Sequence, residues 1–240
     1  MVIAATGFFD GVHLGHRAVL TSLVETARKM GGESLALTFW PHPRAVLQQD
    51  AQKFRLLTSL DEKKEMIQAL GVDQIQIIPF TKEFSAIPSR VFFRDYLGEK
   101  FKVRALVAGY NHRLGADGVH DPHLMDQEAE KVGLQIIRVR EFLSDTGEHI
   151  SSTKIRAALS SGSVETANRW LGYPYCLHGV VISGNRIGRT LGYPTANMQL
   201  YEPLKQLPAN GVYKVEAEVN GTWYKGMMNI GFRPTVANHL

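Results

Sequence analysis

The stretch TGFFDGVHLGH, residues 6–16, lies between a short apolar run and a helical pattern. Residues 2–5 (VIAA) read as a buried strand, and from His16 to Met30 apolar residues recur at intervals of three and four. Residues 34–39 form a second strand-like run. A strand, a helix and a strand within the first 40 residues predict a βαβ unit with parallel strands.

The same alternation continues to about residue 139. Ser59 and Glu62 have the spacing of a capping box, which predicts the start of a helix. The patterns predict strands over 74–78, 103–108 and 134–139, and helices up to residue 70, over 89–97 and over 122–132. Strands that alternate with helices predict a parallel sheet covered on both faces.

The pattern changes near Gly172-Tyr173-Pro174. Two short helices are expected before this point, over 152–159 and 164–171. The expected elements after it are strands over 177–183, 212–220 and 222–229, the last two joined by a hairpin turn at Asn220-Gly221. We therefore expect an α/β domain over residues 1–172 and a smaller β domain over 173–240.

The composition excludes several classes of protein. Lysine and arginine total 27 against 23 acidic residues, which gives a net charge of only +4. The sequence has no dense block of basic residues of the kind that indicates nucleic-acid binding. The single cysteine, Cys176, excludes an intramolecular disulfide and a multi-cysteine zinc site. No apolar run has the length of a membrane span and no leader is evident. We expect a cytoplasmic protein that acts on small molecules, without an obligate protein partner.

Two histidines, His13 and His16, surround Gly15 where the first helix begins. A zinc site is disfavoured because no third ligand with suitable spacing is evident, and buried structural histidines remain an alternative. A helix N-terminus after the first parallel strand offers free N–H groups and the positive end of a dipole. Gly15 would let a bulky anion approach the backbone. This position favours a phosphate site.

A second candidate phosphate site lies at ISSTKIR, residues 150–156. Hydroxyl groups before a helix are most often N-caps, but Ser151, Ser152 and Thr153 exceed what one cap needs. Arg156 lies three residues after Thr153, on the same side of the first turn, and its guanidinium is a permanent forked cation. Together with the histidines, these residues predict a two-sided clamp on a triphosphate.

The segment GFFDGVHLGHR resembles the HxGH signature of the nucleotidyltransferase superfamily, in the form found in bacterial bifunctional riboflavin kinase/FMN adenylyltransferases, the FAD synthetase family. Four more segments fit that family in the same order: TFWPHPRAVL, VAGYNHRLG, ISSTKIRAAL and GRTLGYPTAN. The resemblance implies a Rossmann-like nucleotidyltransferase sheet followed by an antiparallel β-barrel domain. It also implies adenylyl transfer from ATP to FMN, phosphorylation of riboflavin, and Mg²⁺ as cofactor.

The resemblance carries roles over to matching residues. It implies catalytic roles for His13, His16 and Arg156. It places ATP near Gly7, Phe8, Asp10, Gly15, Asn111, Ser151, Ser152 and Thr153. It places the flavin beside Phe39, Pro41 and His42, for which a rigid turn after a strand is an equally good interpretation.

The C-terminal motif GNRIGRTLGYPTAN is not a P-loop, because its spacing differs and Arg189 stands where a P-loop has lysine. By resemblance, Gly184 and Gly188 would let backbone amides reach ATP phosphates. Thr195 and Asn197 would contact Mg²⁺ and ATP in the kinase site, since hydroxyl and amide oxygens are hard ligands. The alternative is a proline-containing turn with local side-chain caps.

The sequence departs from the family beyond NIGFRPT, where family members continue, close the barrel and supply a glutamate base. The printed sequence ends at Leu240, so we expect an incomplete β-barrel and doubtful kinase activity in the chain as given. Two other functions remain open: an adenylyltransferase for another phosphorylated substrate, and a non-catalytic flavin or nucleotide binder. The joint presence of both phosphate motifs argues against the binder, and the PTAN segment argues against the other substrate.

Overall fold

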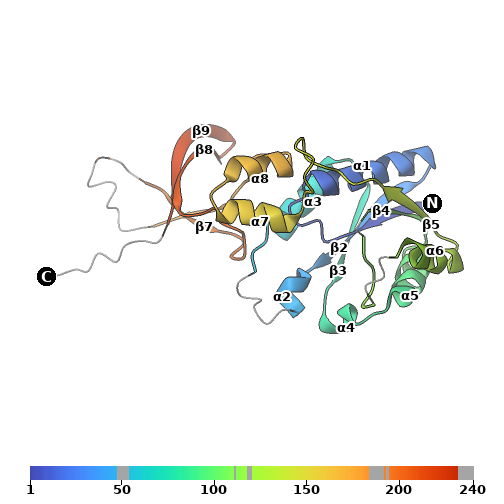
Figure 1. Ribbon diagram of the computed structural model, residues 1–240. Coiled ribbons are helices and arrows are strands. Elements are labelled where there is room, and N and C mark those ends of the chain that lie inside the picture. Colours follow the sequence, from blue (N-terminus) through green and yellow to red (C-terminus); the bar gives the residue numbers. More distant parts are fainter. Residues whose placement is uncertain (48–53, 111, 118–120, 184–191, 193–194, 232–240) are drawn as a thin grey trace. The chain divides into compact units, whose positions relative to one another are not determined.

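The computed structural model describes residues 1–47, 54–110, 112–117, 121–183, 192 and 195–231 (Figure 1). By their internal contacts they form two compact units, Met1–Ser152 and Thr153–Leu240. No helix in these described ranges is both long and apolar enough to cross a membrane.

The first unit is built on a five-stranded parallel sheet with the strand order β3-β2-β1-β4-β5. The strands are β1 (Val2–Thr6), β2 (Glu33–Trp40), β3 (Gln74–Pro79), β4 (Val103–Gly109) and β5 (Gln135–Val139). Val2 of the central strand pairs with Glu33 on one side and Val103 on the other. The order therefore reverses at β1, and open α/β sheets bind ligands at the carboxyl ends of the strands beside such a switch point.

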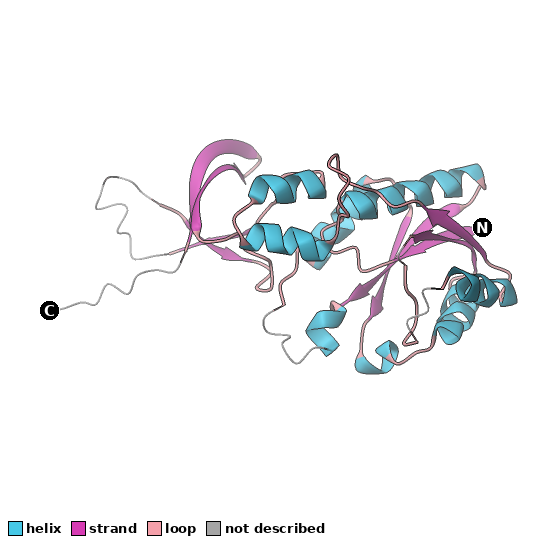
Figure 2. Ribbon diagram, viewed as in Figure 1, coloured by secondary structure: helices cyan, strands magenta, loops and turns pink. Residues whose placement is uncertain are grey.

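Helices cover both faces of this sheet, as the alternating pattern predicts (Figure 2). Alternate residues of β1 point to opposite faces, so Ala4 joins one apolar cluster while Ile3 and Ala5 join the other. Helices α1 (Leu14–Lys29) and α3 (Leu60–Ala69) pack on the Ile3 side. The Ala4 side is covered by residues of the π-helix η2 (Phe92–Lys100) and of α6 (Pro122–Lys131).

The capping box at the start of α3 is confirmed. The Ser59 hydroxyl accepts a hydrogen bond from the Glu62 amide at 3.2 Å, and the Glu62 carboxylate accepts one from the Ser59 amide at 2.7 Å. The helix expected over 89–97 differs from prediction, because it forms α5 (Ser89–Val91) and continues as η2. The short helices α2 (Pro43–Leu47) and α4 (Lys82–Ser85) were not predicted.

The second unit contains two antiparallel pairs of strands. Its elements are α7 (Ser152–Ser160, whose first residue belongs to the first unit), α8 (Val164–Leu171), β6 (Gly179–Ile182), β7 (Asn197–Leu200), β8 (Gly211–Val219) and β9 (Thr222–Ile230). β6 pairs with β7 and β8 with β9, so the described strands form no closed barrel. The hairpin turn at Asn220-Gly221 is confirmed, with positive φ at both residues. The strand β7 was not predicted.

Helix α7 is tied to the β strands of its unit. The Ala209 amide, just before β8, donates to the Leu159 carbonyl at 2.9 Å. The contacts therefore group α7 and α8 with the C-terminal strands, whereas the change from alternating helices and strands to strands alone lies after them, near residue 172.

Candidate active site

The segment between β1 and α1, with the first turn of α1, is called here the histidine turn (residues 7–16). Its backbone is strained at two positions, since Phe9 has φ 48° and Val12 has φ 34°. Such left-handed conformations cost non-glycine residues about 1–3 kcal/mol each, most for a β-branched residue, and they persist where the surroundings hold them. The turn is therefore held by its neighbours.

The neighbouring segment at Leu57 and Thr58 supplies those contacts. The buried Asp10 carboxylate accepts hydrogen bonds from the Leu57 amide at 3.0 Å and the Thr58 amide at 3.1 Å. The Thr58 hydroxyl in turn accepts one from the Gly11 amide at 3.0 Å. Asp10, predicted to lie near ATP, thus uses its carboxylate to fix the shape of the turn, while its predicted contact with ATP stays a prediction.

The two histidines of the motif are brought into direct contact. His13 is the N-cap of α1, which begins two residues earlier than the apolar pattern indicated, and its Nδ1 accepts from the His16 amide at 3.3 Å. The two imidazole rings stack with centroids 3.6 Å apart and planes inclined by 18°. A Cβ atom at Gly15 would lie 3.3 Å from the His13 ring. Glycine at this position therefore leaves room for the stacked pair.

His16 is held in the neutral form. Burial lowers its pKa well below the usual 6.5, and the nearby His13 and Lys63 lower it further. Within the described part of the chain, its buried Nδ1 has no hydrogen-bond partner. An unsatisfied buried polar atom costs about 1–3 kcal/mol. This atom is therefore suited to a ligand that supplies the missing partner.

Lys63 is a residue of this region that the sequence analysis missed. It lies on α3 with its side chain buried, and its Nζ donates to the Phe8 carbonyl at 3.2 Å and to the Thr38 hydroxyl at 3.0 Å. Burial lowers its pKa from 10.5 to about 8, although Asp10 raises it. The available signal was its place four residues before the buried Ile67, on the inward face of α3.

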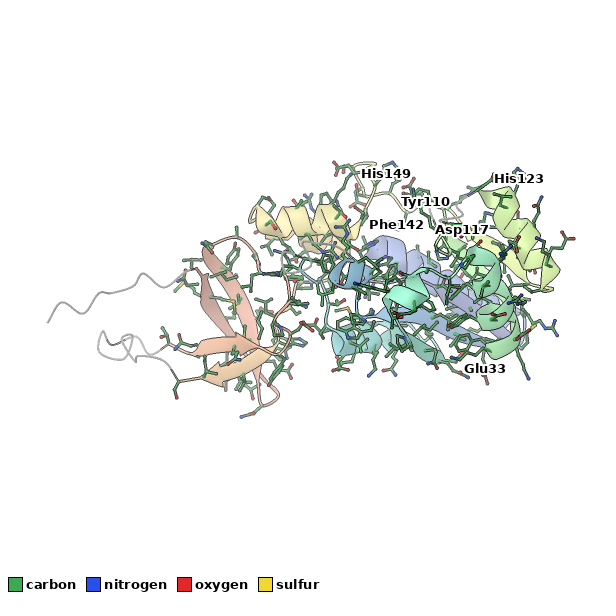
Figure 3. All side chains as sticks on the ribbon, turned by 90° about the horizontal axis from the view of Figure 1, so that it is seen from below. Glu33, Tyr110, Asp117, His123, Phe142 and His149 are labelled. Atoms are coloured by element: carbon green, nitrogen blue, oxygen red, sulfur yellow. The ribbon has the colours of Figure 1, made fainter. Side chains whose placement is uncertain are left out.

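His112 was missed as well. Its Nε2 lies 2.7 Å from the Oγ1 of Thr6, the last residue of β1, and burial lowers its pKa to about 4. Its neighbour Asn111, predicted to lie near the nucleotide, falls outside the described residues. On the other side of Asn111, the exposed Tyr110 stacks on His149 (Figure 3). Both side chains bind the Glu141 carboxylate.

The second phosphate motif begins next to the histidine turn. The Ser152 hydroxyl donates to the Asp10 carbonyl at 2.9 Å, although 142 positions separate the two residues. Ser151 is half-buried beside it. Thr153 and Arg156 follow on α7 in the second unit, Thr153 exposed and Arg156 half-buried.

The predicted flavin residues differ in how accessible they are. Phe39 is buried in the apolar core, with its ring 5.1 Å from that of Phe8. Pro41 is exposed after a cis peptide bond, and the His42 ring stacks on Phe54 with centroids 4.5 Å apart. The partly exposed surface beyond the carboxyl end of β2 is therefore formed by His42 and Phe8, while Phe39 supports it from below.

The remaining predicted site residues are Gly7 of the histidine turn and four residues of the C-terminal motif. A Cβ atom at Gly7 would lie 2.8 Å from the Phe9 ring, so the histidine turn needs glycine there. Gly184 and Gly188 fall outside the described residues. Thr195 is exposed, and Asn197 opens β7 opposite Ile182 of β6. Of the two oxygen ligands expected for the kinase site, Asn197 is therefore the first residue of a strand and Thr195 lies two residues before it.

Comparison with known proteins identifies both halves of the chain. Residues 1–154 match the family model of FAD synthetase, and residues 171–240 match that of riboflavin kinase. A solved structure described as a macrolide-efflux protein from Streptococcus pneumoniae has 29% sequence identity and a TM-score of 0.86, over 98% of this chain and 75% of that one. This agreement supports the α/β fold with smaller antiparallel sheets.

Curated relatives agree with the family models. The bifunctional riboflavin kinase/FMN adenylyltransferase of Listeria monocytogenes is 38% identical over 97% of this chain and 73% of its own length. The proteins of the same name from Bacillus subtilis and Escherichia coli K12 are 38% and 37% identical, over 72% and 74% of their lengths. With both halves matched in order, the chain belongs to the bifunctional riboflavin kinase/FMN adenylyltransferase family.

Proposed function

We propose that this protein transfers the adenylyl group of ATP to FMN at the histidine turn, and that its C-terminal half phosphorylates riboflavin with ATP. One observation carries the first activity: the stacked histidines at the start of α1, with the buried Nδ1 of His16 lacking a partner among the described residues. Membership of the family supports both activities.

The reaction needs positioning more than covalent chemistry. A phosphate oxygen of FMN attacks the α-phosphorus of ATP, the bond from that phosphorus to the bridging oxygen of the β-phosphate breaks, and pyrophosphate leaves. Negative charge grows on the leaving oxygen, where hydrogen-bond donors stabilise the transition state. Neutral His16 supplies one ring N–H, and the first turn of α1 supplies backbone N–H groups and its dipole.

The second motif serves the same triphosphate in this proposal. Ser152 lies against the histidine turn through its bond to the Asp10 carbonyl. Thr153 and Arg156 follow on α7, where a hydroxyl and a forked cation suit phosphate oxygens. Arg156 is thus proposed as the permanent positive charge that balances the departing pyrophosphate.

The flavin is proposed to lie over the aromatic surface beyond β2. Phe8 and His42 have ring centroids 5.3 Å apart and are both partly exposed, so a flat ring system can stack on them. Pro41 would border the same surface, and the buried Phe39 would fix it from within.

For the kinase half, we propose Thr195 and Asn197 as ligands of Mg²⁺ and ATP. Their hydroxyl and amide oxygens fit a hard cation; Asn197 is the first residue of β7, and Thr195 lies two residues before it. When bound, Mg²⁺ would neutralise phosphate charge during transfer. We also propose that the boundary between the two functions lies at residue 172, and that the enzyme works in the cytoplasm on small molecules alone.

A substrate panel tests the assignment to FMN. The purified chain is incubated with ATP, Mg²⁺ and either FMN, phosphopantetheine or nicotinate mononucleotide, and pyrophosphate release is measured. We expect release with FMN and none above background with the other two. Release with another acceptor but not with FMN would replace the proposed substrate, and no release with tight nucleotide binding would indicate a non-catalytic binder.

A further inference from the structure

The ammonium group of Lys63 is buried with an acceptor for each of its three N–H bonds. Its Nζ lies 3.2 Å from the Phe8 carbonyl oxygen, 3.0 Å from the Thr38 hydroxyl and 3.4 Å from the Phe39 carbonyl oxygen. The side chain is only 3% exposed, and the Trp40 ring centroid lies 5.5 Å from Nζ. Lysine is almost never buried so fully unless it is paired, so this position requires an explanation.

The three acceptors come from two segments that meet at the candidate active site. Phe8 belongs to the histidine turn and precedes the strained Phe9, while Thr38 and Phe39 lie near the end of β2. The Thr38 hydroxyl also donates to the Phe8 carbonyl at 3.3 Å. The ammonium group thus joins α3, β2 and the histidine turn in one network of hydrogen bonds.

We propose that Lys63 is a positioning residue for adenylyl transfer, whose protonated ammonium group holds the histidine turn against β2 in the conformation that binds ATP. The effect of Lys63 on catalysis rests on the proposed function, whereas its effect on ATP binding can be measured separately. A neutral amine has one donor fewer and no charge, so it cannot satisfy all three acceptors. Loss of the proton should therefore loosen Phe8 and the residues that follow it.

The groups around Lys63 set the pH at which this occurs. Burial lowers its pKa to about 8, against the opposite effect of Asp10 in the histidine turn. His16 in the first turn of α1 interacts with it, and the positive charge of Lys63 helps to lower the pKa of His16. On its own helix, Glu62 is engaged in the capping box. We therefore expect ATP affinity and turnover to fall as the pH rises through about 8.

The test compares Lys63→Met and Lys63→Arg with a matched control, Lys64→Met. Lys64 is the next residue of α3, and its side chain is 40% exposed and pairs with Asp61. For each protein, the dissociation constant of ATP is measured by calorimetry and kcat for FAD formation by chromatography, from about pH 6 to 10. Thermal melts establish which variants are folded.

At neutral pH, Lys63→Met should lower ATP affinity or kcat by up to about 100-fold, because a small displacement of positioning groups can cost that much. It should also lack the decline above pH 8, while Lys63→Arg should recover part of the activity and move the decline to higher pH. Lys64→Met should match the unmodified protein. If Lys63→Met does not fold, the role of Lys63 is decided by comparing the pH profiles of ATP affinity and kcat for the unmodified protein and Lys63→Arg.

The two proposals can fail separately. Loss of ATP affinity above pH 8 that Lys63→Arg prevents would support the role of Lys63 even if no FAD forms, in which case the proposed function fails. Two results would overturn the role of Lys63. One is FAD synthesis that declines over the same pH range in Lys63→Arg as in Lys64→Met. The other is a folded Lys63→Met variant whose ATP affinity and kcat are unchanged.

Discussion

The Oγ1 of Thr6 and the Nε2 of His112 lie 2.7 Å apart and join the end of β1 to the loop after β4. The two strands are neighbours inside the sheet, so this bond links their carboxyl ends just before the histidine turn. Because burial lowers the pKa of His112 to about 4, the pair is formed by a neutral imidazole.

This pair should make the protein less stable in acid. In the unfolded chain His112 gains a proton near pH 6.5, whereas in the folded protein it does so near pH 4. The unfolded state therefore binds more protons between these values, and stability falls as the pH drops from about 6.5 towards 4, by at most about 3 kcal/mol. Urea titrations at several pH values measure this slope. His112→Gln should reduce it, while the exposed His123→Gln should not; equal slopes for both variants would contradict the account.

His16→Ala should act on the chemical step. It removes a donor to the charge that develops on the leaving phosphate, and loss of one such donor costs on the order of 3 kcal/mol, or about 100-fold in kcat. Steady-state kinetics of FAD formation at saturating ATP and FMN give the value, with His123→Ala on α6 as the control. An unchanged kcat with a higher KM would mean that His16 binds the ground state and the transition state equally and does not stabilise the charge that develops.

Arg156→Lys keeps a positive charge but loses the planar fork. Bidentate contacts to phosphate need the guanidinium geometry, so ATP turnover should fall about tenfold. The control is Arg169→Lys at an exposed position on α8, for which no change is expected. Steady-state kinetics with varied ATP at a fixed FMN concentration compare the turnover of the two variants. If the two lysine variants behave alike, Arg156 contributes only diffuse charge.

Asp10→Ala should destabilise the protein as well as slow it. The substitution leaves the buried amides of Leu57 and Thr58 without their acceptor and releases the strained turn, at a cost of about 2 kcal/mol. The exposed Asp61→Ala on α3 serves as the control. Equilibrium unfolding in urea measures both, and a stability for Asp10→Ala equal to that of Asp61→Ala would show that the carboxylate does not hold the turn.

Most of the first unit could be predicted from the sequence because its signals are local. Apolar runs mark the strands, and the Ser59–Glu62 spacing marks a helix start within four residues. Short elements such as β7 and α4 have four residues each, too few for a periodic pattern.

Only the part of the candidate site that is formed by residues close in sequence could be predicted, for the same reason. The histidine pair is local, three residues apart, and its contact follows from the helix that it caps. The contact of Lys63 with Phe8 spans 55 positions and that of His112 with Thr6 spans 106, and neither can be read from neighbouring residues. For Phe39 the sequence suggested a contact with the flavin, but the side chain is buried in the core, and an aromatic residue beside a motif can have either place.

The central claim is tested most directly by following the α-phosphate of ATP. The chain is incubated with FMN, Mg²⁺ and ATP labelled at the α-phosphorus, and products are separated by chromatography. Adenylyl transfer predicts that the label moves into FAD and that one pyrophosphate is released for each FAD formed. Consumption of FMN and ATP with no label in a flavin product, or no reaction of either substrate, would contradict it.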